Sequence, residues 1–350
     1  MQIWAQLNPT EQAKLLSRPA LANSQALGDT VTDIIEQVKQ HGDKALLAFT
    51  ERFDGTKLDN VRFNDETLSS FASQIKPEVK WAIDQAYANI KAFHQAQYPD
   101  DVVVETTPGV VCELKHAPLA SVGLYIPGGT APLPSTVLML GATAQVAGCA
   151  RKVLCTPPNK YGQIAIEIRY AASLCDIDEI YLIGGAQAIA ALALGTESII
   201  KVDKIFGPGN SYVTEAKQQV SLIPAGPAID MPAGPSEVLV IADKQANPVF
   251  VAADLLSQAE HGTDSQAVLV SNSADLIAAV KQQVTLQLTT LNRKTIAEQA
   301  VKHSRYILTE TLEQAFEVSN AYAPEHLIIQ IENARDSLDK LTNAGSIFVG

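Results

Sequence analysis

Short apolar runs alternate with helical patterns over most of this 350-residue chain, and this alternation limits the folds open to it most strongly. From residue 120 to about residue 235, each strand-like run is followed by a helix-like segment. A second series of the same kind starts at residue 237 and closes on a strand-like run at 346–349. Parallel strands need long crossover connections, usually helices, so this spacing is typical of βαβ units. We therefore predict an α/β fold with two doubly wound, Rossmann-like parallel sheets.

The first 100 residues are expected to be mainly helical. An apolar face at 31–38 stops at Gly42, and Asp43 is a candidate N-cap for the next helix. A second amphipathic helix is predicted over 77–96. Residues 101–117 have the pattern of a hairpin that turns at Pro108 and Gly109.

Two domains are expected, because single hydrophobic cores stop growing at about 250–300 residues. We assign residues 1–119 and 237–350 to the first α/β domain, together with the N-terminal helices and the hairpin. Residues 120–236 form the second, Rossmann-like domain.

Composition and charge limit the kinds of molecule that the protein is expected to bind. Hydrophobic residues make up 47% of the chain and charged residues 18%, as in globular proteins. The net charge of −12 argues against nucleic acid or an anionic membrane, which both need a basic surface. No apolar run approaches the roughly 20 residues that span a bilayer, and no signal peptide is visible. Four cysteines without CxxC spacing fit reduced thiols in the cytoplasm.

Three Gly-rich loops follow predicted strands, at 125–132, 183–190 and 206–213. Each leads into a helix N-terminus, where free N–H groups and the helix dipole favour a phosphate. None matches GxGxxG, and a tight turn alone would explain each loop taken singly. Together at one sheet edge they favour a dinucleotide site, in which Tyr125 could stack and Gln187 could form hydrogen bonds.

Residues 257–265 allow two interpretations. Gln258 and His261 are three residues apart at a helix end, so they share a face, as does Asp254. An imidazole nitrogen and an amide oxygen suit zinc, but a catalytic zinc usually takes about three protein ligands. The alternative is a helix stop with Gly262 in a left-handed conformation, which spacing alone favours.

Glu325 and His326 lie side by side at a predicted strand entrance. An imidazole can accept a proton at neutral pH and a carboxylate can activate water, so the pair is a candidate acid–base site. A polar strand start after Pro324 is an equally good interpretation. Cys149 and Cys155 are candidate aldehyde nucleophiles, but we discount them because neither has a cationic neighbour in sequence.

Several of these stretches together resemble one family, the histidinol dehydrogenases, in the same order and over essentially the whole chain. The residues that carry the resemblance are 120–129, 184–198, 201–210, 230–243, 254–262 and 324–329.

The resemblance implies a zinc- and NAD-dependent homodimer that oxidises L-histidinol through L-histidinaldehyde to L-histidine. It implies that Gln258 and His261 bind zinc and substrate, and that Glu325 and His326 are the acid–base pair. His326 would also contact the substrate. The remaining implied contacts are Ser236 with the substrate, and Tyr125, Gln187 and Asn210 with NAD.

The family also continues past the strand that ends here at Gly350. In the family, that C-terminal segment supplies an Asp and a His as further zinc ligands and crosses to the partner subunit. For the 350 residues alone, two alternatives therefore stay open. One is a non-catalytic nucleotide- or metabolite-binding module, and the other is an inactive truncated fragment of the enzyme.

Overall fold

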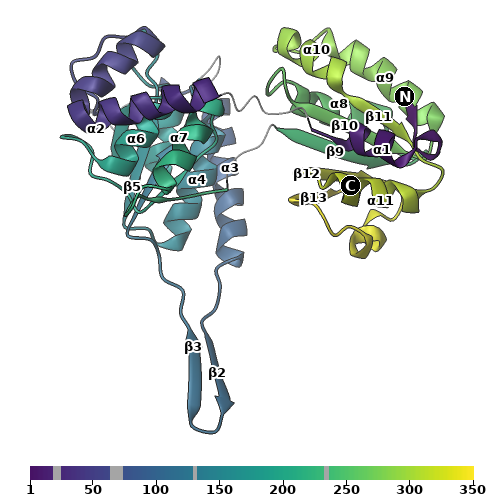
Figure 1. The fold of residues 1–350 in the computed structure, drawn as a ribbon, viewed down its shortest axis with the longest axis horizontal. Coiled ribbons are helices and arrows are strands. Elements are labelled where there is room, and N and C mark those ends of the chain that lie inside the picture. The colour runs from purple at the N-terminus through teal and green to yellow at the C-terminus, as the bar shows by residue number, and fades with distance from the viewer. Residues whose placement is uncertain (19–24, 64–73, 129–131, 232–235) are drawn as a thin grey trace. The chain divides into compact units, whose positions relative to one another are not determined.

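The computed structural model describes residues 1–350 apart from 19–24, 64–73, 129–131 and 232–235. The chain forms two compact units (Figure 1). Unit 1 comprises Met1–Ala22 and Gly234–Gly350, and unit 2 comprises Asn23–Ala233. Among the described residues, no helix is both long enough and apolar enough to span a bilayer.

Unit 2 contains a five-stranded parallel sheet in the order β6-β5-β4-β7-β8. In chain order this is 3-2-1-4-5, so the strand order reverses between β4 and β7, where ligands bind in doubly wound sheets. The strands are β4 (Ser121–Tyr125), β5 (Arg151–Thr156), β6 (Glu179–Leu182), β7 (Lys204–Phe206) and β8 (Ala228–Ile229). The crossover helices are α4 (Pro134–Ala147), α5 (Ile166–Leu174), α6 (Gly185–Leu194) and α7 (Ser211–Ser221).

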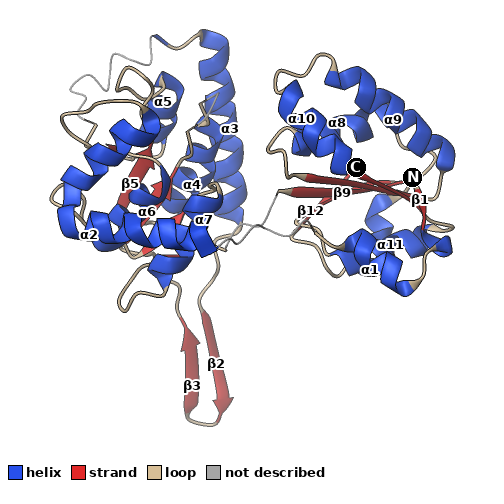
Figure 2. Cartoon of the chain, turned by 45° about the horizontal axis from the view of Figure 1, so that its top comes forward, coloured by secondary structure: helices blue, strands red, loops and turns tan. Residues whose placement is uncertain are grey.

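Unit 1 repeats this topology in the order β1-β11-β10-β9-β12-β13, with β1 added at one edge. The strands are β1 (Gln2–Ile3), β9 (Glu237–Ala242), β10 (Gln266–Ser271), β11 (Arg305–Leu308), β12 (His326–Gln330) and β13 (Ser346–Val349). The helices are η1 (Trp4–Gln6), α1 (Pro9–Leu16), α8 (Pro248–Ala259), α9 (Ala274–Leu288), α10 (Lys294–His303), α11 (Leu312–Tyr322) and η3 (Ala334–Lys340). Helices cover both faces of the sheet (Figure 2). The prediction of two doubly wound parallel sheets is confirmed.

The domain boundaries differ from the expected ones. Residues 23–119 belong with 120–233 and not with 237–350. In helix α2 (Gln25–Asp54), the apolar face that includes Ile34 and Leu46 packs in one core with Leu192 of α6. Helix α3 (Pro77–Ala96) contributes Ile83 to the core that holds α4. Periodicity shows which face of a helix is apolar, but it does not show which sheet that face will cover.

The expected break at Gly42 is confirmed, because α2 consists of two helices joined across a kink at Gly42, whose backbone is non-helical with φ 51°. The expected cap at Asp43 is wrong. Asp43 does not act as a local N-cap. Its carboxylate accepts a hydrogen bond from the Ser198 hydroxyl, and its backbone N–H donates to Glu197 at 2.8 Å. The kink is therefore held by the loop after α6.

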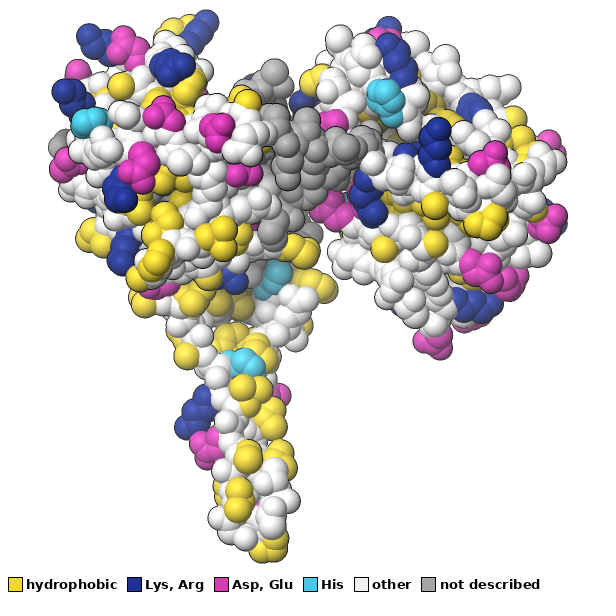
Figure 3. All heavy atoms as spheres, in the orientation of Figure 1, with side chains coloured by type: hydrophobic (Ala, Val, Ile, Leu, Met, Phe, Trp, Pro, Cys, Tyr) yellow, Lys and Arg dark blue, Asp and Glu magenta, His cyan; other side chains and the backbone are white. Residues whose placement is uncertain are grey.

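The predicted hairpin is confirmed as β2 (Val102–Thr107) and β3 (Val110–Leu114), which turn through Gly109 at φ 83°. The register pairs Val102 with Leu114 and Val104 with Cys112 on one face. These side chains are exposed, and hydrophobic atoms line the hairpin in Figure 3. We call Val102, Val104, Cys112 and Leu114 the apolar hairpin face.

Candidate functional site

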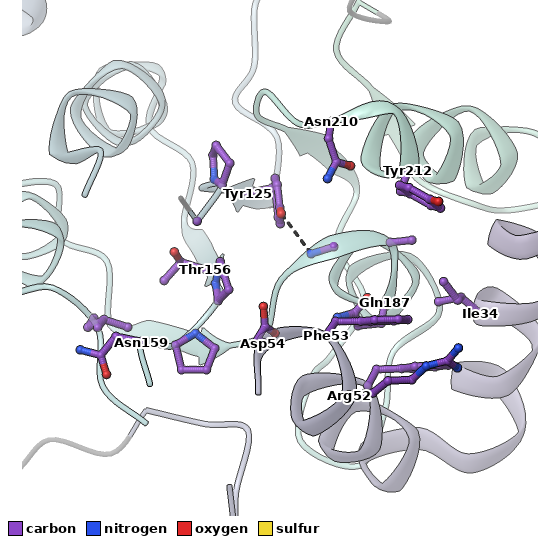
Figure 4. Close-up of a pocket in the computed structure, with 18 of the residues that line it drawn as sticks. Ile34, Arg52, Phe53, Asp54, Tyr125, Thr156, Asn159, Gln187, Asn210 and Tyr212 are labelled. Atoms are coloured by element: carbon purple, nitrogen blue, oxygen red, sulfur yellow. Dashed lines mark hydrogen bonds between the residues drawn. The ribbon is translucent and has the colours of Figure 1, made fainter. Parts of the chain in front are cut away.

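Unit 2 holds a cavity of about 1140 Å³ at the carboxyl end of its sheet, large enough for a nucleotide cofactor (Figure 4). Tyr125 ends β4, Gln187 lies in the first turn of α6, and Asn210 precedes α7. All three line this cavity. The structure thus brings together side chains from the ends of three different strand–helix connections, as the doubly wound topology requires.

Tyr125 is fixed at the N-terminus of α6. Its hydroxyl accepts a hydrogen bond from the Gly185 backbone N–H at 3.0 Å. Burial raises the pKa of Tyr125 to about 12, so the phenol keeps its proton at neutral pH and can donate it to a ligand. Gly184 is sterically required here, because a Cβ atom at this position would lie 2.7 Å from the Pro157 side chain.

The loop that carries Asn210 is held by a buried lysine. Lys217 forms an ion pair with Asp230 and donates to the Gly207 carbonyl at 2.9 Å, while the Gly207 N–H donates to Asp230 at 2.8 Å. Asn210 caps α7, since its Oδ1 accepts from the Val213 N–H at 3.1 Å. Its amide nitrogen remains as the group that can serve a ligand.

The other predicted residues lie in unit 1, at the amino-terminal edge of its sheet. Ser236 precedes β9, and His326 begins β12, where it pairs in register with Val238 of β9. Helix α8 runs back from the carboxyl end of β9, so its last turn, with Gln258 and His261, precedes the start of β10. The Ser236 carbonyl accepts from the Gln266 N–H of β10 at 3.0 Å. Topology therefore places all five residues at one edge.

The end of α8 tests the glycine-stop interpretation of residues 257–265, and the metal site stays a prediction. The helix ends at Ala259, Glu260 is its C-cap in right-handed geometry, and Gly262 has no positive φ. The predicted glycine stop is therefore wrong. Instead the His261 N–H donates to the Gln258 carbonyl at 3.2 Å, a tight turn in which residues i and i+3 lie on one side.

Gln258 is buried, and its amide nitrogen has no hydrogen-bond partner among the described residues. Buried amides are nearly always bonded, so this one has capacity for a ligand. His261 is exposed. Asp254, the third residue of that face, bonds instead to Gln330 at the far end of β12, and burial raises the pKa of its carboxyl group.

Glu237, which sequence analysis missed, organises the Glu325–His326 segment. Its buried carboxylate accepts two hydrogen bonds from the Arg18 guanidinium, at 2.8 and 2.7 Å. It also accepts from the Tyr322 hydroxyl at 2.9 Å and from the Glu325 N–H at 3.1 Å. The available signal was an acid at the start of an otherwise apolar strand.

The backbone of Glu237 also sets the tautomer of His326. The Nδ1 atom of His326 lies 3.2 Å from the Glu237 backbone carbonyl, which can only accept a hydrogen bond. The neutral ring therefore carries its proton on Nδ1 and leaves Nε2 free to accept another. The Glu325 carboxylate lies 3.7 Å from the same Nδ1 atom.

The backbone before this pair is strained. Ala323 has φ 52°, a left-handed conformation that costs a non-glycine residue about 1–3 kcal/mol. Arg18 holds it by donating to the carbonyls of Tyr322 and Ala323, at 2.9 and 2.8 Å. Strain held by a buried charge network is typical of functional segments.

The three buried cysteines are poor candidates for a nucleophile. Cys149, Cys155 and Cys175 are buried, and burial raises the pKa of each thiol, to about 12 for Cys175. The structure thus agrees with discounting Cys149 and Cys155. Over the described residues, no group of three or more His, Cys, Asp or Glu side chains is arranged to hold a metal ion.

The two sheets and the cavity at one switch point define a two-domain, Rossmann-like α/β protein, and comparisons with known proteins identify its family. The histidinol dehydrogenase family model matches residues 16–350. Histidinol dehydrogenases of Colwellia psychrerythraea and Aliivibrio fischeri are 59% and 56% identical to this chain. The matches cover 99% of this chain in both cases, and 80% and 78% of the relatives.

A crystal structure of histidinol dehydrogenase from Elizabethkingia anophelis superposes with a TM-score of 0.95 at 48% identity. It covers all of this chain, and 80% of that chain is matched. The chain belongs to the histidinol dehydrogenase family. It is therefore an oxidoreductase of a family that acts in histidine biosynthesis.

Replacing Glu237 tests the network in unit 1. Glu237→Gln retains the shape but leaves Arg18 without its counter-charge, so we expect unfolding free energy to fall by about 2 kcal/mol. Urea denaturation followed by circular dichroism measures this. Glu317→Gln removes an exposed carboxylate from α11 and should change little. Equal stability of the two variants would contradict the role of Glu237.

Proposed function

We propose that this protein oxidises L-histidinol through L-histidinaldehyde to L-histidine with zinc and NAD, as the last steps of histidine biosynthesis. The observation that carries the proposal is the pair Glu325–His326, held by Glu237 with the His326 Nε2 atom free to accept a proton. We also propose a cytoplasmic location, which fits four cysteines that are all free.

NAD fits the cavity of unit 2. The cavity is large enough for at least one nucleotide of the dinucleotide. Tyr125 offers a protonated hydroxyl next to the backbone N–H groups at the start of α6. We propose that Tyr125, Gln187 and Asn210 bind NAD. When bound, NAD supplies the acceptor for the two hydrides that leave the substrate.

Zinc fits the last turn of α8. The side-chain carbonyl oxygen of the buried Gln258 and an exposed imidazole three residues later are ligands that suit this metal. We propose that Gln258 and His261 bind zinc and, through it, the substrate. When bound, zinc supplies a fixed positive charge that orients the alcohol, with further ligands from outside these two residues.

The chain's own side chains then move the protons. His326 Nε2 accepts the proton of the substrate hydroxyl, while the Glu237 carbonyl holds the ring by its Nδ1–H. Glu325 accepts a proton from the water that adds to the aldehyde, and the protonated His326 returns its proton to the carbonyl oxygen, which gives the hydrate that is oxidised in the second step. Ser236, at the same sheet edge, is the proposed hydrogen-bond partner of the bound substrate.

Replacing His326 tests the acid–base assignment. His326→Ala should lower kcat for histidinol by at least about 100-fold while zinc content stays unchanged, because the variant loses only the proton acceptor. Steady-state NADH formation and elemental analysis measure the two quantities. His303→Ala, at the exposed end of α10, is the matched control and should keep full activity. Undiminished turnover in the His326 variant would refute the role.

Replacing His261 tests the metal assignment. His261→Ala should lose zinc after dialysis, whereas His303→Ala should not. We propose that the remaining ligands come from the family's C-terminal segment, so zinc is measured in the protein with that segment and in residues 1–350 alone. We expect zinc in the first and little zinc or turnover in the second. Unchanged zinc in the His261 variant would rule out this ligand.

We further propose that the protein is a homodimer that uses the apolar hairpin face. A two-stranded hairpin that exposes Val102, Val104 and Leu114 at about half of their surface is marginally stable alone. Exposed contiguous apolar surface of this kind marks an interaction site. The opposite face carries Glu105 and Glu113 next to valines, so only one face is uniformly apolar.

Placing a carboxylate on one or the other face of the hairpin tests which face forms the proposed dimer interface. Val104→Asp should shift the protein from dimer to monomer, because the carboxylate would be buried without a partner. Val103→Asp places the same charge on the face that already bears Glu113 and should leave the dimer intact. Light scattering after gel filtration measures the mass. A dimer that survives both substitutions would exclude this interface.

A further inference from the structure

One carboxylate in the cavity of unit 2 has no function within the fold. Asp54 ends helix α2, is half-buried and lines the cavity. Its Oδ2 atom is buried and has no hydrogen-bond partner among the described residues. An acceptor left unbonded beside a cavity is available to a ligand that brings donors.

Among the described residues, no cation forms an ion pair with this carboxylate. Burial is the single cause that raises the pKa of Asp54, to about 6. Arg52, two residues away, instead lies over the Phe53 ring, 5.1 Å from its centroid. At neutral pH the ionised group therefore lowers the stability of the protein. A cost of this kind at a cavity indicates a function there.

Its neighbours form a surface for a nucleoside. Figure 4 shows Asp54 and Phe53 at the end of α2, facing the cavity that Tyr125 and Gln187 also line. Phe53 is half-exposed, packs in parallel on Phe49 and adds apolar surface to the cavity beside Asp54.

The chemistry of Asp54 indicates which part of a dinucleotide it would contact. In doubly wound folds an acidic side chain bonds to the adenosine ribose of NAD, whereas a 2′-phosphate is accommodated by a cation. A carboxylate that accepts from two neighbouring hydroxyls suits a ribose diol and repels a phosphate.

We propose that Asp54 accepts hydrogen bonds from the 2′- and 3′-hydroxyls of the adenosine ribose and thereby selects a dinucleotide without a 2′-phosphate. This inference rests on the proposed NAD-dependent function and adds a specificity residue to it. Asp54 contacts no reacting atom in this arrangement and acts through cofactor binding.

Asp54→Asn tests the inference, with Glu51→Gln as a control that removes an exposed carboxylate of the same helix outside the cavity. Calorimetry with NAD, NADP and ADP-ribose gives the dissociation constants. In Asp54→Asn, binding of NAD and of ADP-ribose should weaken by about 10-fold or more, since bonds to a charged group are lost. The preference for NAD over NADP should fall by a similar factor. The control should match the unsubstituted protein.

Thermal unfolding separates a ligand role from a structural one. Because folding raises the pKa of Asp54, its penalty is present in full above pH 6 and fades as the pH falls toward 4. Asp54→Asn should therefore melt at a higher temperature at pH 7.5, with the gain lost near pH 4. Asp29, Asp33 and Arg52, which line the same cavity, are unchanged in this comparison. A lower melting temperature would mean a structural role and would overturn the inference.

Two results would distinguish a failure of the Asp54 assignment from a failure of the proposed dehydrogenase function. Unchanged NAD, NADP and ADP-ribose affinities in Asp54→Asn, in a protein that still oxidises histidinol, would overturn the inference alone. Loss of ADP-ribose binding in that variant, with no histidinol oxidation by the unsubstituted protein, would support the inference while refuting the dehydrogenase proposal.

Discussion

The buried carboxylate of Glu237 is the interaction on which the candidate acid–base site depends. It joins Arg18, which follows α1 in the chain, to the end of α11 and to the amide of Glu325. An isolated charge at this depth would be unstable, and the bidentate arginine and two further donors stabilise it. The strained Ala323 is retained only because these bonds hold the backbone on both sides.

The two sheets share one strand order but use opposite edges. In unit 2, the cavity lies at the carboxyl ends of the strands, where helix N-termini point at the ligand, as doubly wound folds usually arrange it. In unit 1, the proposed metal and proton-transfer residues lie at the amino ends, next to the last turn of α8. An electropositive helix N-terminus suits phosphates, whereas the electronegative C-terminus of a helix such as α8 suits a cation.

The errors of sequence-based prediction share a cause. Gly262 lacks the left-handed conformation expected of it, and Asp43 bonds to Ser198 in place of a local cap. In both cases the local sequence pattern allowed the predicted conformation. A tertiary hydrogen bond replaced the local cap at Asp43, and a different turn replaced the left-handed turn at Gly262. The N-terminal helices were assigned to the wrong unit because the sequence of an amphipathic helix does not show which sheet its apolar face covers.

By itself, the sequence determined the class of fold, the two parallel sheets, the hairpin and the residues that could carry chemistry. Those features follow from periodicity and from residue types, which are local. Only the tertiary structure decided that Tyr125, Gln187 and Asn210 line one cavity, and that Glu237 fixes the tautomer of His326. It also exposed the unpartnered Asp54. Burial and hydrogen bonding join residues that are distant in sequence, so no local pattern could specify them.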